Sequence, residues 1–392
     1  MRVGFNALFL GQEATGSGQY TGQLLHALAQ LDQRDEYLLY TLQKPDSFGK
    51  PSFRNADTQV LRTPFAGRSK NLNKLWFEQI ALPRACLRAA LDLAHVPYFA
   101  SPLCPTVPTV VTVHDLIPLL LPEYRGAVLV RLYMHLVAAA ARRARLIITD
   151  SLASRNDIVK HLRVPAGRVH VIYLAAHPAC RPVMDRKALA IVQQKYDVPD
   201  RYILYLGGFD QRKNLGALLQ AYHRTSTILE REAPPLVVAG RLPAVDTPLF
   251  PDPRRLASEL GISQRVIFTG WVEEQDKPAL YSGALFFAFL SLYEGFGLMP
   301  LEAMSCGTPV LASRTSSLPE VVGDGGLLVD PENVDETTDG MIILLSDPQL
   351  REQLAENALA KAAEFDWKRT AEQTLKVYAA AVADQDPGLS RD

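Results

Sequence analysis

The sequence predicts an α/β protein built from two doubly wound, Rossmann-like units, each with a parallel sheet that helices cover on both faces. Three observations support this prediction. The chain has 392 residues, which is more than one hydrophobic core usually serves. Short runs rich in β-branched and aromatic residues alternate with longer helical patterns. The alternation starts again after the proline-containing stretch 177–185, so we expect one domain over residues 1–180 and a second over 181–366, with a cleft between them.

The expected strands are almost continuously apolar, which is typical of parallel sheets buried on both faces. In such sheets ligands bind beyond the carboxyl ends of the strands. A helical pattern at 367–383 is expected to pack back on the first domain, and a loose tail follows at 384–392. The predicted strands cover residues 2–8, 36–42, 91–96, 109–115, 145–151 and 169–175 in the first domain and 202–208, 235–241, 266–271, 284–291, 308–313 and 325–330 in the second.

Charge is distributed unevenly along the chain. The formal net charge is −1, but residues 1–180 carry 20 Lys and Arg against 12 Asp and Glu, and residues 181–392 carry 21 against 30. A basic half is typical of proteins that meet an anionic partner, such as a membrane surface, and equally typical of a solvated face. The basic, aromatic-containing stretch 65–80 fits either a membrane contact or a helix packed on its own domain.

The cysteines and the apolar runs bear on localisation. Cys86, Cys104, Cys180 and Cys306 lie far apart, form no Cys-x-x-Cys pair and sit in or beside apolar stretches, which favours reduced thiols and the cytoplasm. Met1 leads directly into a strand-like run, so no signal peptide is expected. No apolar stretch reaches about 18 residues without a charge, so a membrane contact would be peripheral, at the inner face of the plasma membrane.

The segment EGFGLMPLE, residues 294–302, carries the main functional signal. It follows a buried strand and predicts a glycine turn and then a helix that opens near Leu298. The first amides of a helix have no intrahelical partner and bind anions, here those of Phe296, Gly297 and Leu298. Gly295 and Gly297 allow a diphosphate to approach the backbone closely. We therefore expect an anion site at this turn.

Glu294 and Glu302 stand at the two ends of this segment. Ionised carboxylates accept paired hydrogen bonds from vicinal hydroxyls, so one glutamate can face a sugar and the other a ribose. The alternative is that both only complement the positive end of the helix.

A second loop follows the strand that ends in Gly207-Gly208 and precedes a helix that starts near Asn214. Arg212 and Lys213 lie in this loop. Held across the cleft from the glycine turn, these cations would neutralise a departing diphosphate. A solvated turn is the alternative.

Two features of the first domain are also candidates. Gly16 and Gly18 are expected in a loop just before a helix and can bring backbone amides to a phosphate, although a plain turn fits nearly as well. His114 ends the strand at 109–115 and, as a neutral imidazole, can hydrogen-bond a sugar hydroxyl or a backbone carbonyl; a structural role is the alternative. The chain has no Gly-x-Gly-x-x-Gly motif followed by an acidic residue, which disfavours a nicotinamide enzyme.

Metal chemistry is not expected. The eight histidines show no His-Glu-x-x-His spacing. The only Asp-x-Asp, Asp384-Gln385-Asp386, lies in the expected loose tail, where no helix or strand would hold the ligands of a metal and diphosphate site in place. Cationic side chains and helix amides would then stabilise a diphosphate.

With these residues named, the chain resembles glycosyltransferase family 4, a group of retaining enzymes with the GT-B fold, over essentially its whole length. The most specific match is EGFGLMPLEAMSCGTPVLAS, residues 294–313, with its Glu-x7-Glu spacing. It is supported by RKN (212–214), SGQYT (17–21), VHDLIP (113–118) and FTGW (268–271).

The resemblance implies a nucleoside diphosphate sugar held mainly by the second domain, an acceptor held mainly by the first, and no divalent metal. It implies that Glu302 holds ribose hydroxyls and that Glu294 holds hydroxyls of the donor sugar. It also implies that Lys213 and Arg212 bind the diphosphate.

For the remaining positions, the resemblance implies that His114 touches the transferred sugar, that the Gly16 loop lies over the phosphates, and that the backbone near Val272 meets the base. One departure concerns Gly207-Gly208, where many relatives have Gly-Arg. This removes one guanidinium from the diphosphate site, for which Arg212 would have to compensate.

Together with these residues, the resemblance implies transfer of a hexose-type sugar, with retention of configuration, from a GDP- or UDP-linked donor to a hydroxyl of a glycan, lipid-linked or small-molecule acceptor. The leaving phosphate could itself take the acceptor's proton. A GT-B nucleotide-sugar epimerase is the alternative enzyme, and it would isomerise the donor without an acceptor. A non-catalytic sugar-nucleotide binding protein is the alternative class, against which Glu294, Lys213 and His114 argue.

Overall fold

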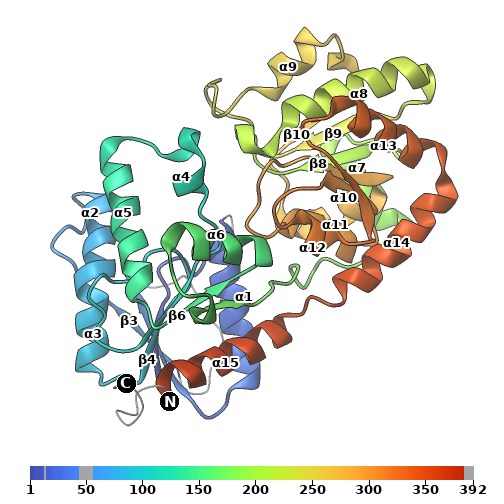
Figure 1. The fold of residues 1–392 in the computed structure, drawn as a ribbon. Helices are drawn as coiled ribbons and strands as arrows, with labels where there is room; N and C mark the ends of the chain where they lie inside the picture. Colours follow the sequence, from blue (N-terminus) through green and yellow to red (C-terminus); the bar gives the residue numbers. More distant parts are fainter. Residues whose placement is uncertain (13–14, 44–55, 384–392) are drawn as a thin grey trace. The chain divides into compact units, whose positions relative to one another are not determined.

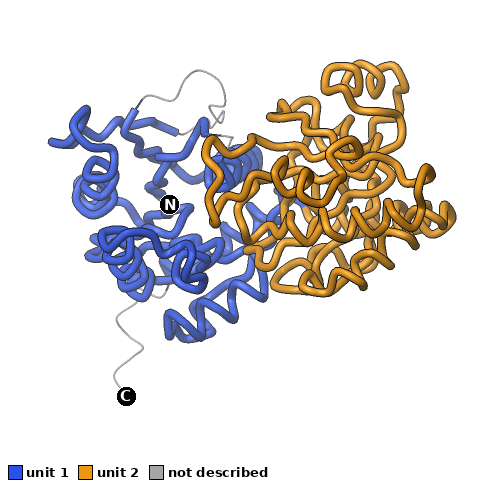
Figure 2. The backbone as a smooth tube through the Cα atoms, turned by 90° about the horizontal axis from the view of Figure 1, so that it is seen from above, with its two compact units in different colours: residues 1–174, 366–392 blue, residues 175–365 orange. Residues whose placement is uncertain are grey.

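The computed structural model describes residues 1–12, 15–43 and 56–383. The chain forms two compact units: Met1–Leu174 together with the C-terminal segment from Asp366, and Ala175–Phe365 (Figure 2). Each unit holds one parallel sheet with helices on its faces (Figure 1). This confirms the predicted α/β class with two Rossmann-like sheets. The expected tail, with Asp384 and Asp386, lies outside the described residues.

The sheet of the first unit has seven strands in the order β3-β2-β1-β4-β5-β6-β7, and every neighbouring pair is parallel. Six of them lie within predicted runs. The seventh, β3, was missed because its sequence Ala-Asp-Thr-Gln-Val has no apolar run, as suits a strand at the exposed edge of a sheet. The strands are β1 (Arg2–Asn6), β2 (Glu36–Thr41), β3 (Ala56–Val60), β4 (Leu93–Val96), β5 (Thr109–Thr112), β6 (Leu146–Thr149) and β7 (Val169–Val171).

The helices of the first unit include the last helix of the chain, α15 (Trp367–Ala383). It packs against α1 (Gly16–Leu31), and the hydroxyl of its Tyr378 lies 2.6 Å from Nδ1 of buried His95 on β4. The other helices are α2 (Lys70–Trp76), the π-helix η1 (Phe77–Ala81), α3 (Leu82–Arg88), α4 (Ile117–Leu120), η2 (Pro122–Tyr124), α5 (Val128–Arg143), α6 (Leu152–Leu162) and η3 (Ala166–Arg168).

The sheet of the second unit has six parallel strands in the order β10-β9-β8-β11-β12-β13. Its four central strands, β9, β8, β11 and β12, are buried at every residue, which agrees with their apolar sequences. The strands are β8 (Ile203–Leu206), β9 (Leu236–Ala239), β10 (Val266–Gly270), β11 (Phe286–Phe289), β12 (Val310–Ser313) and β13 (Gly326–Val329). The α-helices are α7 (Arg186–Tyr196), α8 (Leu215–Leu229), α9 (Pro253–Glu259), α10 (Lys277–Gly283), α11 (Leu298–Ser305), α12 (Leu318–Val322), α13 (Val334–Ser346) and α14 (Pro348–Ala362).

The strand order of the second unit reverses beside its first strand. The chain moves outward from β8 to β10 on one side and then returns to place β11 on the other side of β8. Loops that leave the carboxyl ends of β8 and β11 therefore diverge, and the crevice at such a switch point is where open α/β sheets bind ligands. The predicted Lys213 loop follows β8 and the predicted glycine turn follows β11.

Several predicted strands are longer than the observed ones. The run at 109–115 forms a strand only over Thr109–Thr112, so His114 and Asp115 lie in the loop after β5. In that loop His114 lies within hydrogen-bond distance of Asp150, and the Asp115 carboxylate accepts from the amide of Ile117. Among the described residues, no helix combines the length and the apolar character needed to cross a membrane.

Candidate active site

The loop between β8 and α8 directs Lys213 inward. Residues Gln211–Lys213 form one turn of 3₁₀ helix, and Asn214 adopts a left-handed conformation with φ of 54° before α8 begins at Leu215. The side-chain amide of Asn214 donates a hydrogen bond to the carbonyl of Pro331 at 2.7 Å, which fixes the bend. As a result the Lys213 side chain is buried, with 5% of its surface exposed.

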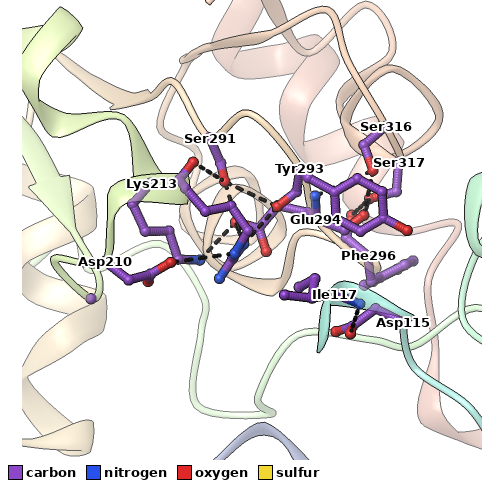
Figure 3. Close-up of polar contacts among 12 residues, drawn as sticks. Asp115, Ile117, Asp210, Lys213, Ser291, Tyr293, Glu294, Phe296, Ser316 and Ser317 are labelled. Atoms are coloured by element: carbon purple, nitrogen blue, oxygen red, sulfur yellow. Dashed lines mark hydrogen bonds and ion pairs between the residues drawn. The ribbon is translucent and has the colours of Figure 1, made fainter. Parts of the chain in front are cut away.

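Glu294 joins the two loops at the switch point. Its Oε1 lies 2.7 Å from Nζ of Lys213 (Figure 3). The same oxygen lies 2.8 Å from Nη1 of Arg212. The Lys213 ammonium also lies 4.9 Å from the ring centroid of Phe289 on β11. Burial alone would raise the pKa of Glu294, but Lys213 and Arg212 lower it by more, so its pKa lies below the ordinary value and the carboxylate is ionised.

This geometry corrects one expectation. Lys213 and Arg212 were placed across a cleft from the glycine turn, whereas they form ion pairs with Glu294 within the second unit. The reason is the strand order, since β8 and β11 are neighbours and their loops leave the same edge of one sheet.

Two serines after β12 hold the glycine turn. The Ser316 hydroxyl accepts from the amide of Glu294 at 3.2 Å, and Ser317 Oγ donates to the carbonyl of Phe296 at 2.6 Å. Both hydroxyls also lie within hydrogen-bond distance of the Glu294 carbonyl. Figure 3 shows both serines beside Glu294. The sequence reasoning missed them, although the Ser-Arg-Thr-Ser-Ser stretch after the strand at 308–313 marks a loop at the same sheet edge.

Gly297 is required by the turn that starts α11. Its φ is 114°, and a Cβ at this position would lie 2.9 Å from Cδ2 of Leu318. The helix begins at Leu298 as predicted, and Gly297 makes no side-chain capping bond because it has no side chain. The backbone of Gly295–Leu298 therefore presents the start of α11 at the switch point, the arrangement that favours an anion.

Glu302 occupies a different environment from Glu294. It lies inside α11, is 3% exposed, and its Oε2 accepts a hydrogen bond from the Tyr281 hydroxyl at 3.2 Å. Burial raises its pKa from 4.5 to about 7; Lys277 opposes this shift and Glu274 adds to it. The two glutamates are therefore shifted in opposite directions, which their spacing alone did not indicate.

We expect the free energy of unfolding of the ligand-free protein to fall as pH rises from about 5 to about 8. The pKa of Glu302 in the folded protein, about 7, lies above its ordinary value of 4.5. The contribution of this shift to the free energy of unfolding is therefore fully present below pH 4.5 and is lost as the pH rises through about 7. The difference corresponds to about 3 kcal/mol.

Urea unfolding over this pH range measures the effect, and Glu302→Gln should remove most of the fall. Glu259→Gln, at a surface glutamate with a side chain 56% exposed, serves as the matched control. Parallel pH profiles of the wild type and Glu302→Gln would contradict the expectation.

Val272 lies beyond the end of β10, as the sequence placed it, whereas Gly207, which the sequence placed at the end of a strand, lies just beyond the end of β8. A Cβ on Gly207 would approach Sδ of Met299 at 3.2 Å, so its lack of a side chain allows close packing against α11. Val272 is buried, and beside it the half-exposed Trp271 lies 5.1 Å below the guanidinium of Arg241. This Arg241–Trp271 pair was not singled out from the sequence.

In the first unit, His114 is held by two acceptors. Its Nδ1 lies 2.6 Å from Oδ2 of Asp150, and its Nε2 lies 3.2 Å from the carbonyl of Pro97. Both ring nitrogens must donate to make these bonds, which favours the imidazolium form. Burial lowers the pKa of His114, but Asp150 raises it by more, so the pKa lies above its ordinary value. The geometry therefore disfavours the neutral imidazole expected from the sequence, and it adds Asp150, which the sequence analysis did not identify.

Gly16 and Gly18 do not precede a helix but lie in the first turn of α1. The side chain of Thr15 caps this helix by accepting from the amide of Gly18 at 3.1 Å. A Cβ on Gly18 would lie 2.0 Å from the carbonyl oxygen of Gln12. Packing against the Gln12 backbone therefore explains why position 18 is a glycine, without any contact to a phosphate. The described residues also contain no group of three or more His, Cys, Asp or Glu side chains arranged to hold a metal ion.

Comparison with a solved structure identifies the fold. Sucrose-phosphate synthase from Thermosynechococcus elongatus has the same fold, with a TM-score of 0.77 at 22% sequence identity, over 98% of this chain and 100% of that chain. The chain, with its two parallel-sheet units, therefore has the GT-B fold.

The family follows from sequence comparison. Residues 14–178 match glycosyltransferase family 4, and residues 188–361 match glycosyl transferases group 1. O-antigen chain mannosyltransferase B of Escherichia coli is 36% identical over 269 residues, 69% of this chain and 69% of that protein. Serotype-specific mannosyltransferase WbdA of Escherichia coli is 35% identical over 274 residues, and the chain spans 33% of its length. The chain belongs to glycosyltransferase family 4 and is a glycosyltransferase.

Proposed function

We propose that the protein transfers a hexosyl group, specifically mannosyl, from a nucleoside diphosphate donor to a hydroxyl acceptor, with retention of configuration and without a metal ion. The observation that carries this proposal is the buried cluster of Lys213, Arg212 and Glu294 beside the start of α11. Mannose is inferred because two relatives are named mannosyltransferases.

In the ligand-free structure the two cations are paired with Glu294. A diphosphate would compete for these cations, because phosphate oxygens and a carboxylate are alternative acceptors for the same N–H groups. Glu294 would then be released toward the hydroxyls of the donor sugar. Glu302 would hold the ribose, and the backbone near Val272, with the Arg241–Trp271 pair, would meet a GDP or UDP base.

Transfer would proceed on the face that the diphosphate leaves. The acceptor oxygen bonds to the anomeric carbon as the bond from that carbon to the phosphate oxygen breaks, and the acceptor proton passes to the phosphate. Negative charge grows on the diphosphate, and Lys213, Arg212 and the α11 amides are placed to stabilise it. His114, cationic beside Asp150, would contact the transferred sugar.

The acceptor would be a glycan or a lipid-linked sugar, since a relative acts on an O-antigen chain according to its name. We propose that the enzyme works in the cytoplasm, with its four cysteines free as in the structure.

A thermal-shift screen tests the donor site. We expect GDP or UDP to raise the apparent melting temperature by several degrees at about 100-fold excess over Kd, where binding adds about 2.7 kcal/mol. The corresponding monophosphate should give a much smaller shift, because it lacks the second phosphate that reaches Lys213. The shift should persist in EDTA. An equal thermal shift with the nucleoside mono- and diphosphate would contradict the proposed site. A product whose anomeric configuration is inverted relative to the donor would contradict retention.

A further inference from the structure

A pocket lies in the second unit between the β8–α8 loop and the loop that joins β9 to α9. Its volume is about 430 Å³, which is within the range of small-molecule sites. One wall is formed by residues between 209 and 216, and the other by residues between 246 and 256. None of the residues to which a donor contact was assigned lines this pocket, so the donor does not account for it.

The loop between β9 and α9, residues 240–252, has thirteen residues and contains no helix or strand. Loops of this length without secondary structure are uncommon in compact domains and are usually functional. This loop is nevertheless fixed, because the Gln211 amide donates to the Leu249 carbonyl at 2.8 Å and the Asp252 amide donates to Oδ1 of Asp246 at 2.9 Å. The pocket wall is therefore preformed and tied to the β8–α8 loop.

The pocket and the proposed donor site lie on different sides of the second sheet. Helix α9 packs on α8, whereas α11 packs on α10 and α14. Figure 1 shows α8 and α9 on one side of the strands β8–β10 and shows α10 and α11 on the other. The pocket lies at the starts of α8 and α9, and the Glu294 cluster lies at the start of α11. A ligand can therefore occupy the pocket without displacing a donor.

Much of the pocket lining is apolar. Phe209 and Leu215 are each 5% exposed and form part of the first wall. The second wall contributes three prolines, Pro248, Pro251 and Pro253. Rigid apolar surfaces of this kind can bury the C–H groups of a sugar ring.

The carboxylate of Asp246 supplies hydrogen-bond acceptors at the pocket. Its Oδ2 lies 2.6 Å from Nε of Arg255, and its Oδ1 accepts from the Asp252 amide. The amide and the guanidinium together hold the pKa of Asp246 below its ordinary value, so this carboxylate is ionised at neutral pH. An ionised carboxylate has about four acceptor positions, so these two partners leave positions for the hydroxyls of a ligand.

The charge of the lining disfavours an anionic ligand. Arg255 is the only cation among the described residues that line the pocket, and it is paired with Asp246 at 2.6 Å and with Glu259 at 2.6 Å. A nucleotide or a free phosphate would also meet the carboxylate of Asp210. A neutral ligand rich in hydroxyl groups matches these walls.

We propose that this pocket binds a hexosyl residue of a glycan chain, at a site separate from that of the donor. Asp246 would accept from hydroxyls of the sugar while Phe209 and the prolines cover its C–H groups. The wall residues 246–248 are exposed, so the chain can continue from the pocket into solvent. A second glycan site of this kind would keep the chain near the enzyme between transfers. Only the choice of a mannose-containing chain rests on the proposed function.

Saturation-transfer NMR of the full chain with an α-linked mannotriose tests the proposal. We expect mannotriose to bind equally with and without saturating GDP or UDP, and methyl α-mannoside to bind more weakly, because a single sugar fills less of the pocket. Gly216→Leu should weaken mannotriose binding at least about ten-fold, since Gly216 lines the pocket and a Cβ there would meet no atom within 4 Å. Asp246→Asn should weaken it about five-fold, because a charged acceptor becomes neutral.

The matched control is Gly167→Leu, at a glycine of the first unit where a Cβ would also meet no atom within 4 Å. It should leave mannotriose binding unchanged. The melting temperature of Gly216→Leu should not fall below that of the wild type, because leucine favours a helix more than glycine does. Its thermal shift with GDP or UDP should equal that of the wild type, which separates this test from that of the donor site.

Maltotriose serves as a second probe. Binding of maltotriose in place of mannotriose, lost in Gly216→Leu, would support the pocket and change only the sugar in the proposed function. A wild-type protein that responds to the nucleotide but binds neither trisaccharide would overturn the proposal. So would displacement of the trisaccharide by the nucleotide, equal trisaccharide binding by the wild type and Gly216→Leu, or loss of the nucleotide response in Gly216→Leu. Equal binding of methyl α-mannoside and mannotriose would also overturn it, because the pocket would then be a site for a free sugar.

Discussion

Lys213→Ala should lower turnover by about 10²- to 10³-fold, the loss usually seen when one group that stabilises developing charge is removed from a buried site. Lys213 is 5% exposed, so its ammonium acts where water screens little of its charge. Its present partner is Glu294 Oε1 at 2.7 Å, and a leaving diphosphate would be the partner during transfer. Initial rates at saturating donor, with the acceptor held constant, measure the effect.

The control for this change is Arg254→Ala, which removes an exposed cation from the same unit and should leave turnover unchanged. The Arg254 side chain is 56% exposed and forms an ion pair with Asp252 at 2.6 Å. Lys213→Arg should recover part of the rate, because it keeps the charge but not the compact shape of an ammonium. A Lys213→Ala enzyme with at least a third of wild-type turnover would remove Lys213 from the proposed mechanism.

Most of the fold was predictable from the sequence because parallel strands buried on both faces are short apolar runs between helical patterns. The runs around β8 and β11 are of this kind, and both strands lie within the predicted ranges. The edge strand β3 was not predictable in this way, because hydrogen bonds to β2 and not apolar burial define it. Strand ends were placed too far along the chain wherever a polar residue such as His114 continues an apolar run into the loop.

The site was predictable residue by residue but not as an arrangement. Glu294, Lys213 and Arg212 were named from their loops, yet their mutual ion pairs depend on β8 and β11 being neighbours, which follows from strand order. Asp150 and Ser316 were missed because each acts on a residue more than 20 positions away, through a loop that has no motif of its own.

The opposite shifts of the two glutamates also follow from packing. Glu294 faces two cations that lower its pKa, while Glu302 lies beside the Tyr281 hydroxyl in an apolar part of α11, where burial raises its pKa. Their spacing in the sequence places Glu294 just before α11 and Glu302 inside it. The surrounding elements decide which of the two carboxylates is ionised at neutral pH.

Glu294→Ala should destabilise the ligand-free protein and abolish most transfer, yet keep or strengthen the binding of GDP or UDP. Removing the carboxylate leaves Lys213 and Arg212 buried without their shared counter-charge, which costs about 3–5 kcal/mol. The double variant Lys213→Ala/Glu294→Ala should lose less stability than the two single variants together, because each single change leaves a buried charge that the other removes.

The binding result follows from the competition between Glu294 and a diphosphate for the same two cations. With the carboxylate gone, Arg212 keeps its ion pair with Asp210 at 3.4 Å, and nucleotide phosphates can take the place of Glu294 beside both cations. The thermal shift caused by the nucleoside diphosphate should therefore equal or exceed that of the wild type. Turnover should fall because nothing then holds the donor sugar. A Glu294→Ala protein that is as stable as the wild type would show that the ion pairs contribute little to folding. One that no longer responds to the nucleotide would show that Glu294 organises the phosphate site and does not compete with it.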